Sequence, residues 1–241
     1  MEGEDSIGLP ARGECRRAFL ERTGAGNVDR VAFLLVDVDD FSRFNVMYSH
    51  SFGDRFLERS DRDMLDLLPD GYEACRYGVD QLLIAGYGCG VSDMRTVFRR
   101  LSHYARAEHE LDGVRYRFAL SAAIVAYPGD AQDWDSIEKG LSVALRKAKR
   151  DGGDRVVLFT SSLLGERLYE QGLMAQLARD VETGFRGFRV VHQPLCDSAA
   201  LRVCGAEALL RYNTPSGVAI SPVELVPVLE SSGLIKPVGL W

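Results

Sequence analysis

Three acidic residues follow directly on a run of six apolar residues near the start of the chain. The run Val31-Ala-Phe-Leu-Leu-Val36 leads into Asp37-Val-Asp-Asp40. An unbroken apolar run of this length indicates a strand buried on both faces. Clustered carboxylates repel one another unless water or a cation relieves the charge, and Mg²⁺ prefers oxygen ligands together with substrate phosphates. The stretch therefore predicts either a metal–nucleotide site or a solvated acidic loop before a helix.

A further acidic residue, Asp80, lies in a tight turn near Gly78 between two predicted strands. Apolar periodicity predicts a strand over residues 31–36, a helical region over 41–68 with a break near Ser49, and two strands within 72–86. It then predicts a helix over 94–104, a strand over 116–127, a helix over 137–148 and a strand over 155–159. The first six elements have the split βαβ order of a ferredoxin-like sheet. In that topology Asp37 and Asp80 should face each other, which favours the metal–phosphate site.

Bulk composition excludes several classes of protein. The 241 residues are 46% hydrophobic and 27% charged with a net charge of −6, which is typical of a soluble globular protein without general attraction to nucleic acid or anionic membranes. The 5 cysteines include no Cys-x-x-Cys pair, which indicates reduced thiols and no zinc site. Residues 1–5 lack a signal-peptide pattern, and no apolar run is long enough to span a membrane. We therefore expect a cytoplasmic protein, with no nucleic-acid partner and no membrane partner in this segment.

Several motifs between residues 5 and 160 share the spacing of one known domain. They are Gly8-Leu-Pro-Ala-Arg12, Asp37-Val-Asp-Asp-Phe41, Asn45, His50, Gly53-Asp54, Tyr127-Pro128 and Ala144-Leu-Arg-Lys-Ala-Lys149. As a set they resemble the GGDEF diguanylate cyclase domain of bacterial cyclic-di-GMP signalling. The resemblance implies a palm-type nucleotide-cyclase sheet with flanking helices.

The character of the sequence changes after Phe159. A helix is predicted over residues 161–182 and strands over 188–194 and 206–211, with the motifs His192-Gln-Pro194, Ala206-Glu-Ala-Leu-Leu-Arg211, Ser221-Pro222 and Glu230-Ser-Ser-Gly-Leu-Ile235. These resemble the beginning of the EAL cyclic-di-GMP phosphodiesterase domain.

Together the two resemblances imply an α/β (α+β) fold: a ferredoxin-like sheet followed by an incomplete fragment of an EAL-type β/α barrel. We expect a degenerate GGDEF domain over residues 1–160, a linker helix with the start of the EAL domain over 161–183, and an N-terminal EAL fragment over 184–241.

The signature hairpin departs from the GGDEF pattern. It contains Gly78, Val79, Asp80, Gln81 and Leu82, where the family has Gly-Gly-(Asp/Glu)-Glu-Phe. Glycine permits positive φ and close approach of a ligand, so Val79 should strain the turn or push the nucleotide away. Gln81 replaces a glutamate, and an amide carries no charge for a metal and cannot act as a base at neutral pH. We therefore assign no catalytic residue to this hairpin.

Other positions of the family pattern are retained. By resemblance, Asp37 and Asp80 are metal ligands, Asn45 and Asp54 read guanine, and Lys149 contacts phosphate. The resemblance thus implies a domain that cannot make cyclic-di-GMP but holds GTP with Mg²⁺ as a regulatory ligand.

In the second segment the resemblance implies cyclic-di-GMP-binding residues. Glu207 would be the first metal ligand, Gln193 and Arg211 would contact the ligand, and Leu209 would pack beneath the base. The family's other metal ligands would fall beyond Trp241, and one carboxylate cannot assemble a two-metal hydrolytic site.

Three functions remain open. The first is a non-catalytic regulatory or receptor module of bacterial cyclic-di-GMP signalling, with GTP or cyclic-di-GMP as its ligand. The second is a fragment of an active phosphodiesterase whose barrel is completed outside this chain, and the third is a nucleotide-free interaction scaffold. The unpaired edges of a partial barrel predict self-association or a partner protein.

Overall fold

The computed structural model describes residues 8–24, 26, 28–197 and 202–241. The chain divides between Leu164 and Gly165 into two compact units, each with its own hydrophobic core. Residues 1–5, for which no signal peptide is predicted, lie outside the described residues. No helix in the described ranges combines the length and apolar character needed to cross a bilayer.

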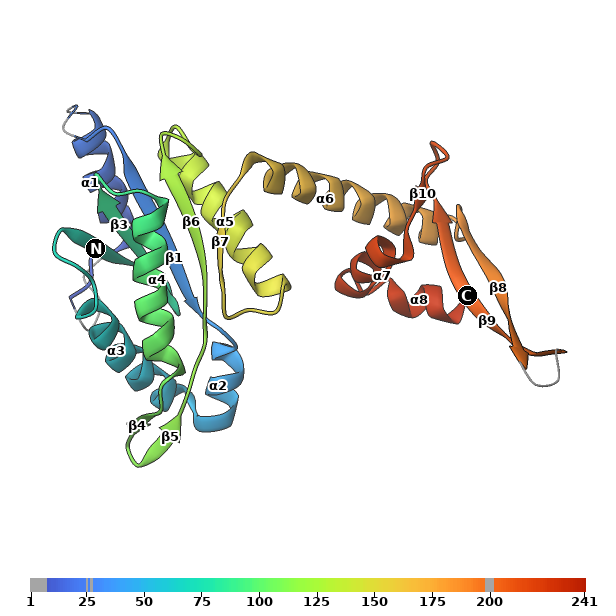
Figure 1. Ribbon diagram of the computed structural model, residues 1–241, viewed down its shortest axis with the longest axis horizontal. Coiled ribbons are helices and arrows are strands. Elements are labelled where there is room, and N and C mark those ends of the chain that lie inside the picture. Colours follow the sequence, from blue (N-terminus) through green and yellow to red (C-terminus); the bar gives the residue numbers. More distant parts are fainter. Residues whose placement is uncertain (1–7, 25, 27, 198–201) are drawn as a thin grey trace. The chain divides into compact units, whose positions relative to one another are not determined.

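Unit 1 is built on a five-stranded sheet with helices on both faces. Its strands lie in the order β2 (Tyr72–Gly78), β3 (Gln81–Tyr87), β1 (Val31–Val38), β6 (Leu120–Tyr127) and β7 (Val156–Leu158) (Figure 1). The first four strands pair antiparallel, and β7 joins β6 in parallel. This is the predicted split βαβ order with one strand added.

The central strand β1 contributes to two cores because its side chains alternate between the faces of the sheet. Ala32, Leu34 and Val36 pack with α3 (His50–Leu65) and α4 (Val91–Arg106). Val31, Phe33 and Leu35 pack with α1 (Arg12–Gly24) and α5 (Trp134–Arg150). Every residue of β1 is buried, as the apolar run predicts.

Two local features differ from, or refine, the predicted elements. The helical region over 41–68 divides at Ser49, where a break was expected, because the residue's φ of 122° ends α2 (Phe41–Tyr48) before α3 begins. The strand predicted over 116–127 is shorter, because residues 109–116 form a separate hairpin of β4 (His109–Leu111) and β5 (Val114–Tyr116). Asp112 and Gly113 both have positive φ, which is the geometry of a tight two-residue hairpin turn.

Unit 2 contains an antiparallel sheet in the order β10 (Ala219–Ile220), β9 (Arg202–Asn213) and β8 (Phe188–Asp197), and helices α6 (Ser161–Glu182), which begins in unit 1, α7 (Pro222–Ser231) and α8 (Ile235–Leu240). In its core the Tyr212 hydroxyl donates a hydrogen bond of 2.6 Å to Asp180 Oδ2 on α6. The strands of a β/α barrel are parallel. The described residues of unit 2 therefore do not show the expected barrel fragment.

Candidate functional site

Asp37 is a buried carboxylate near the end of the central strand. By alternation it shares the α5 face of the sheet with Leu35, and the strand register pairs it with Gln81 on β3 and Ser121 on β6. Its exposed fraction is 1%. The acidic stretch that follows the apolar run therefore starts inside the sheet, so Asp37 is not part of a solvated loop.

Two side chains contact the Asp37 carboxylate. Lys149 Nζ on α5 lies 2.5 Å from Oδ1 as an ion pair, and Gln81 Nε2 donates a hydrogen bond of 2.7 Å to Oδ2. Burial raises the pKa of Asp37 above its usual value because it disfavours the charged form, while the bonds from Lys149 and Gln81 act in the opposite direction. The Lys149 side chain is 44% exposed, so it joins the buried carboxylate to solvent.

The signature turn lies beside Asp37, but the direct contact belongs to Gln81. Asp80 was expected to face Asp37, whereas the register places Gln81 opposite it. The Asp80 main-chain carbonyl accepts a hydrogen bond of 3.1 Å from Val38 N, which ties the turn to the end of β1. The negative charge of Asp80 also raises the pKa of Asp37, but its effect is smaller than that of burial.

Val79 occupies the tip of the hairpin without backbone strain. Among the described residues, the non-glycine positions with positive φ do not include Val79, so the expectation of a strained turn is not met. A register shift between Arg76 and Gly78 lies just before the turn, and Gly78 pairs with Gln81 across it. The Val79 side chain is 73% exposed, so its effect would be to crowd a ligand that approaches the turn.

A magnesium ion does not fit these side chains in their observed arrangement. One oxygen of Asp37 pairs with an ammonium, and the other accepts from an amide nitrogen, which is not a metal ligand. The described ranges contain no group of three or more His, Cys, Asp or Glu side chains able to hold a metal. The metal role of Asp37 and Asp80 remains a prediction, and the observed donors favour an ammonium at this position.

The two residues expected to read guanine lie on adjacent helices. Asn45 is on α2, and Asp54 is an exposed residue near the start of α3, which begins after the break at Ser49. The helices approach closely at Gly53, where an added Cβ would lie only 1.8 Å from Asn45 Oδ1. Asn45 Oδ1 is buried and has no hydrogen-bond partner among the described residues. The structure thus brings the Asn45 amide beside the Gly53-Asp54 pair.

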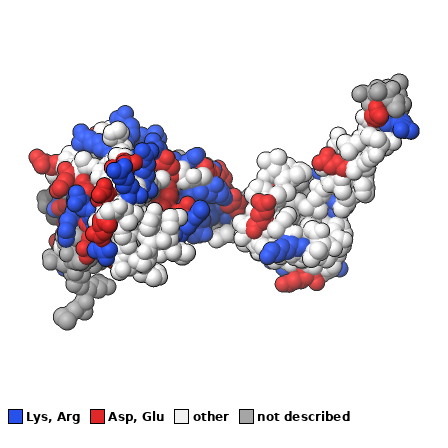
Figure 2. All heavy atoms as spheres, turned by 90° about the horizontal axis from the view of Figure 1, so that it is seen from below, with Lys and Arg blue, Asp and Glu red and all other residues white. Residues whose placement is uncertain are grey.

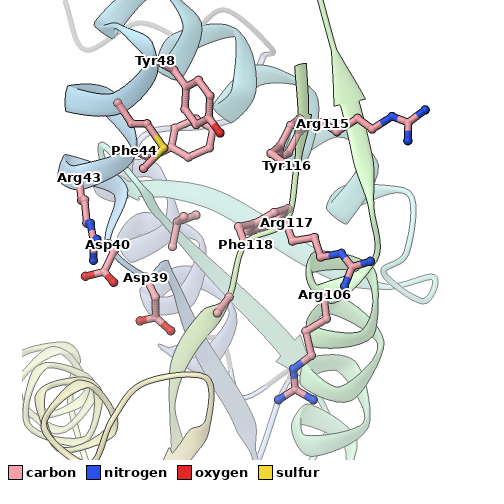
Figure 3. Close-up of a pocket in the computed structure, with 13 residues that line it drawn as sticks. Asp39, Asp40, Arg43, Phe44, Tyr48, Arg106, Arg115, Tyr116, Arg117 and Phe118 are labelled. Atoms are coloured by element: carbon pink, nitrogen blue, oxygen red, sulfur yellow. The ribbon is translucent and has the colours of Figure 1, made fainter. Parts of the chain in front are cut away.

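A pocket that sequence reasoning missed opens on the opposite, α4 face of the sheet. Its volume is about 720 Å³, and it is lined by Val38, Asp39, Asp40, Arg43, Phe44, Met47, Tyr48, Arg106, Arg115, Tyr116, Arg117, Phe118 and Ala119. Figure 3 shows Asp39, Asp40 and Arg43 on one wall and Arg106, Arg115 and Arg117 on the other.

Arginines of this pocket already have acidic partners. Arg106 pairs with Asp154 at 2.9 Å, while Arg115 and Arg117 lie 3.6 and 3.7 Å from Glu108. Figure 2 likewise shows basic and acidic side chains interspersed over the first unit. Asp39 and Asp40 of the acidic stretch line this pocket, but none of the residues assigned to metal or nucleotide does, so the site that the motifs indicate is the one around Asp37.

The predicted cyclic-di-GMP-binding residues of unit 2 share one face of the β8–β9 hairpin. Gln193 pairs with Glu207, Leu209 with Val191, and Arg211 with Arg189. Side chains of paired residues point to the same side, and those two positions apart do as well. Gln193 and Glu207 are exposed, and Leu209 and Arg211 are partly buried.

The sequence matches one family profile, described as "Diguanylate cyclase, GGDEF domain", over residues 12–155. It is 26% identical over 243 residues to the cyclic di-GMP phosphodiesterase PdeR of Escherichia coli, a match that covers 100% of this chain and 36% of PdeR. It is 27% identical over 213 residues to the bifunctional diguanylate cyclase/cyclic di-GMP phosphodiesterase MucR of Pseudomonas aeruginosa, which covers 88% of this chain and 31% of MucR. The chain thus spans about a third of the length of these relatives.

Solved structures share the fold of the first unit. The diguanylate cyclase SiaD of P. aeruginosa, in complex with its activator SiaC, gives a TM-score of 0.60 at 21% identity, covering 65% of this chain and 61% of SiaD. The GGDEF domain of DgcB from Caulobacter crescentus, in complex with c-di-GMP, gives 0.57 at 18% identity, covering 65% of this chain and 95% of that one. With a profile that covers more than half of its length, the chain belongs to the diguanylate cyclase GGDEF domain family.

Proposed function

We propose that this chain is a regulatory domain of cyclic-di-GMP signalling that does not condense GTP into the cyclic dinucleotide. The observation that carries the proposal is the contact between Gln81 and Asp37, in which a neutral amide lies where the family pattern has a glutamate. Phosphoryl-transfer enzymes depend on metal ions to neutralise the charge that develops on the phosphates. With Gln81 and Lys149 on its two oxygens, Asp37 is a poor ligand for such an ion.

The same domain keeps groups suited to binding guanine nucleotide as an allosteric ligand. Asn45 offers an amide with an unsatisfied carbonyl, and Asp54 offers an exposed carboxylate on the neighbouring helix. A carboxylate accepts hydrogen bonds from the donor edge of guanine, and an ammonium binds phosphate. Asn45, Asp54 and Lys149 therefore support GTP, with or without Mg²⁺, as the ligand of the first unit.

Two measurements on the purified chain test this function. Incubation with GTP and Mg²⁺, followed by chromatography of the nucleotides, should yield no cyclic-di-GMP. Calorimetric titration with GTP should show binding that ATP does not reproduce and that Asn45→Ala weakens by about tenfold, the value of one lost hydrogen bond to a charged or unsatisfied partner. Formation of the cyclic dinucleotide would overturn the catalytic half, and absence of GTP binding at millimolar concentration would leave only a scaffold role.

A second candidate function is supported by the shared face of β8 and β9. Gln193, Glu207, Leu209 and Arg211 are the residues that the EAL resemblance selects, and the strand register places all of them on one side of the hairpin. In this proposal unit 2 is the beginning of a phosphodiesterase domain that further chain completes, as the named activity of PdeR supports.

This second proposal predicts different behaviour for the chain and for a longer protein. The chain alone should not hydrolyse cyclic-di-GMP, because Glu207 is a single carboxylate. A longer protein that contains it should hydrolyse the dinucleotide and lose at least about a hundredfold in rate on Glu207→Gln. An unchanged rate in that variant would rule out Glu207 as a metal ligand.

A further inference from the structure

We infer that the Lys149 ammonium serves as a built-in cation at Asp37, so that nucleotide binding at this end of the sheet does not require Mg²⁺. The inference rests on the proposed binding of guanine nucleotide, but the arrangement itself can be tested without a nucleotide. It is based on the geometry of three side chains and on how the last turn of α5 is held.

The last turn of α5 is fixed in place by a glycine cap. Gly152 N donates to Lys149 O at 3.1 Å and Gly153 N to Ala148 O at 3.0 Å, and both glycines have positive φ. This is the pattern of a Schellman-type helix end, which satisfies the final carbonyl groups of the helix. Hydrogen bonds therefore hold the backbone at Lys149 in place.

The loop after α5 is also tied to the end of β1. Asp154 N donates a hydrogen bond of 2.8 Å to Asp39 Oδ2, and an added Cβ on Gly153 would lie 3.0 Å from that oxygen. The main chain on both sides of the Lys149–Asp37 pair is thus joined by a second contact. The end of α5 and the end of β1 are therefore held close together by the hydrogen bond from Asp154 N to Asp39 as well as by the Lys149–Asp37 pair.

Gln81 completes the charge balance. One buried carboxylate and one ammonium leave the cluster of Asp37, Lys149 and Gln81 neutral, and the Gln81 amide satisfies the remaining oxygen. A glutamate at position 81 would place a second carboxylate against Asp37, and two such groups need a cation between them. With Gln81 and Lys149 present, the cluster has no excess negative charge for a divalent ion to neutralise.

A titration with MgCl₂ tests this inference on the whole chain. The natural sequence should show no change in the melting temperature and no calorimetric heat up to about 10 mM Mg²⁺, because mass action stabilises only a protein that binds the ion. The double variant Gln81→Glu/Lys149→Met has two adjacent carboxylates and no ammonium. At ten times its dissociation constant for Mg²⁺, its melting temperature should rise by about 3–6 °C.

Matched variants show whether the effect belongs to this cluster. Lys147→Met, two residues away on α5, removes a lysine that pairs with Asp151 at 2.8 Å on the surface, and Gln81→Glu/Lys147→Met should respond to Mg²⁺ less than the double variant. Adding Asp37→Asn to the double variant should abolish the response. Circular dichroism of each variant confirms that it is folded.

Either of two results would overturn the inference. One is saturable binding of Mg²⁺ to the natural sequence that Asp37→Asn removes, and the other is a folded double variant that does not respond to Mg²⁺. Mg²⁺ bound at Asp37 would also remove one argument against condensation of GTP, which the assay for cyclic-di-GMP decides separately. Neither result bears on whether the chain binds GTP. Where GTP does bind, its dissociation constant in EDTA and in Mg²⁺ should agree within about threefold, and a hundredfold loss in EDTA would contradict the inference.

Discussion

The end of β1 in the first unit and the β8–β9 hairpin in the second carry the two sets of motif residues, and they differ in how far they are enclosed. Asp37 is 1% exposed, and both of its oxygens have partners. Gln193 and Glu207 are exposed on a two-stranded face. The Asp37 carboxylate is paired within the chain, although Asn45 Oδ1 in the same unit is not, whereas Gln193 and Glu207 present their polar groups to solvent. A ligand must displace the internal partners of a residue such as Asp37 before it can bind there, whereas a solvent-exposed residue can be contacted directly.

The cores beneath the two regions explain this difference. In unit 1 a hydrophobic cluster covers each face of the sheet, so the end of β1 is enclosed from both sides. In unit 2 the described core is one smaller cluster. It reaches the β8–β9 hairpin only at the end where β8 begins and β9 ends, through Phe188 and Tyr212. Leu195 and Val203, farther along the same strands, are 50% and 64% exposed.

The largest expected contrast comes from the same substitution in each region. Leu34→Ala removes a fully buried side chain from β1 and should lower the free energy of unfolding by about 2–5 kcal/mol, because it leaves a cavity. Leu195→Ala should change it by less than about 0.5 kcal/mol. Urea denaturation followed by circular dichroism measures both, and similar losses at the two sites would show that the hairpin is covered in solution.

The ion pair at Asp37 should have the next largest effect. Lys149→Met leaves a buried carboxylate without its cation and should cost about 1–3 kcal/mol of unfolding free energy, less than for a fully buried pair because Lys149 is partly exposed. Lys147→Met, which breaks only a surface pair, should cost less than about 0.5 kcal/mol. Equal losses in the two variants, measured by urea denaturation, would contradict the stabilising pairing of Lys149 with the buried Asp37 carboxylate.

The internal hydrogen bond of unit 2 should contribute somewhat less. Tyr212→Phe removes the hydroxyl that donates to Asp180, and Asp180 keeps its bonds from Gln176 at 3.0 Å. We expect a loss of about 1–2 kcal/mol in unfolding free energy. The measurement requires a probe of unit 2, such as the fluorescence of Trp241, which stacks on Phe185, recorded in a Trp134→Phe background because Trp134 lies in unit 1. The same loss in a probe of unit 1 would show that the two units unfold together.

The smallest energetic change should appear in association rather than in stability. The exposed apolar side chains of the β8–β9 hairpin and its strand edges predict weak self-association or a partner protein. Val203→Lys should shift the mass measured by light scattering toward the monomer without lowering the melting temperature. A concentration-independent monomer for the natural sequence would remove the basis for the self-association prediction.

The sequence predicted the parts of the fold that follow from periodicity. The buried strand at Val31–Val38 and the split βαβ order were confirmed because long apolar patterns dominate local structure. The β4–β5 hairpin was missed because apolar alternation continues through it, although Asp112-Gly113 is a turn signal. The antiparallel sheet of unit 2 was not predicted, because the motif resemblance implied a β/α barrel, whose strands are parallel.

The candidate site was predicted in its members but not in its contacts. Asp37 was identified from the acidic residues that follow the strand, yet its partners Gln81 and Lys149 depend on strand register and on the end of α5. A shift of one residue in register exchanges which side chain of a turn faces its neighbour. Whether Asp80 or Gln81 contacts Asp37 could therefore not be decided from the hairpin sequence.

The close contact between α2 and α3 restricts the order in which two positions can change during divergence. Any side chain larger than hydrogen at position 53 would collide with the amide of Asn45, since the added carbon would lie 1.8 Å from its oxygen. A lineage can discard the amide by one substitution at position 45 and keep the helices together. Enlarging position 53 requires the Asn45 side chain to turn away or to be replaced, so a homologue with alanine at 53 should have lost the asparagine or should hold its amide in another rotamer.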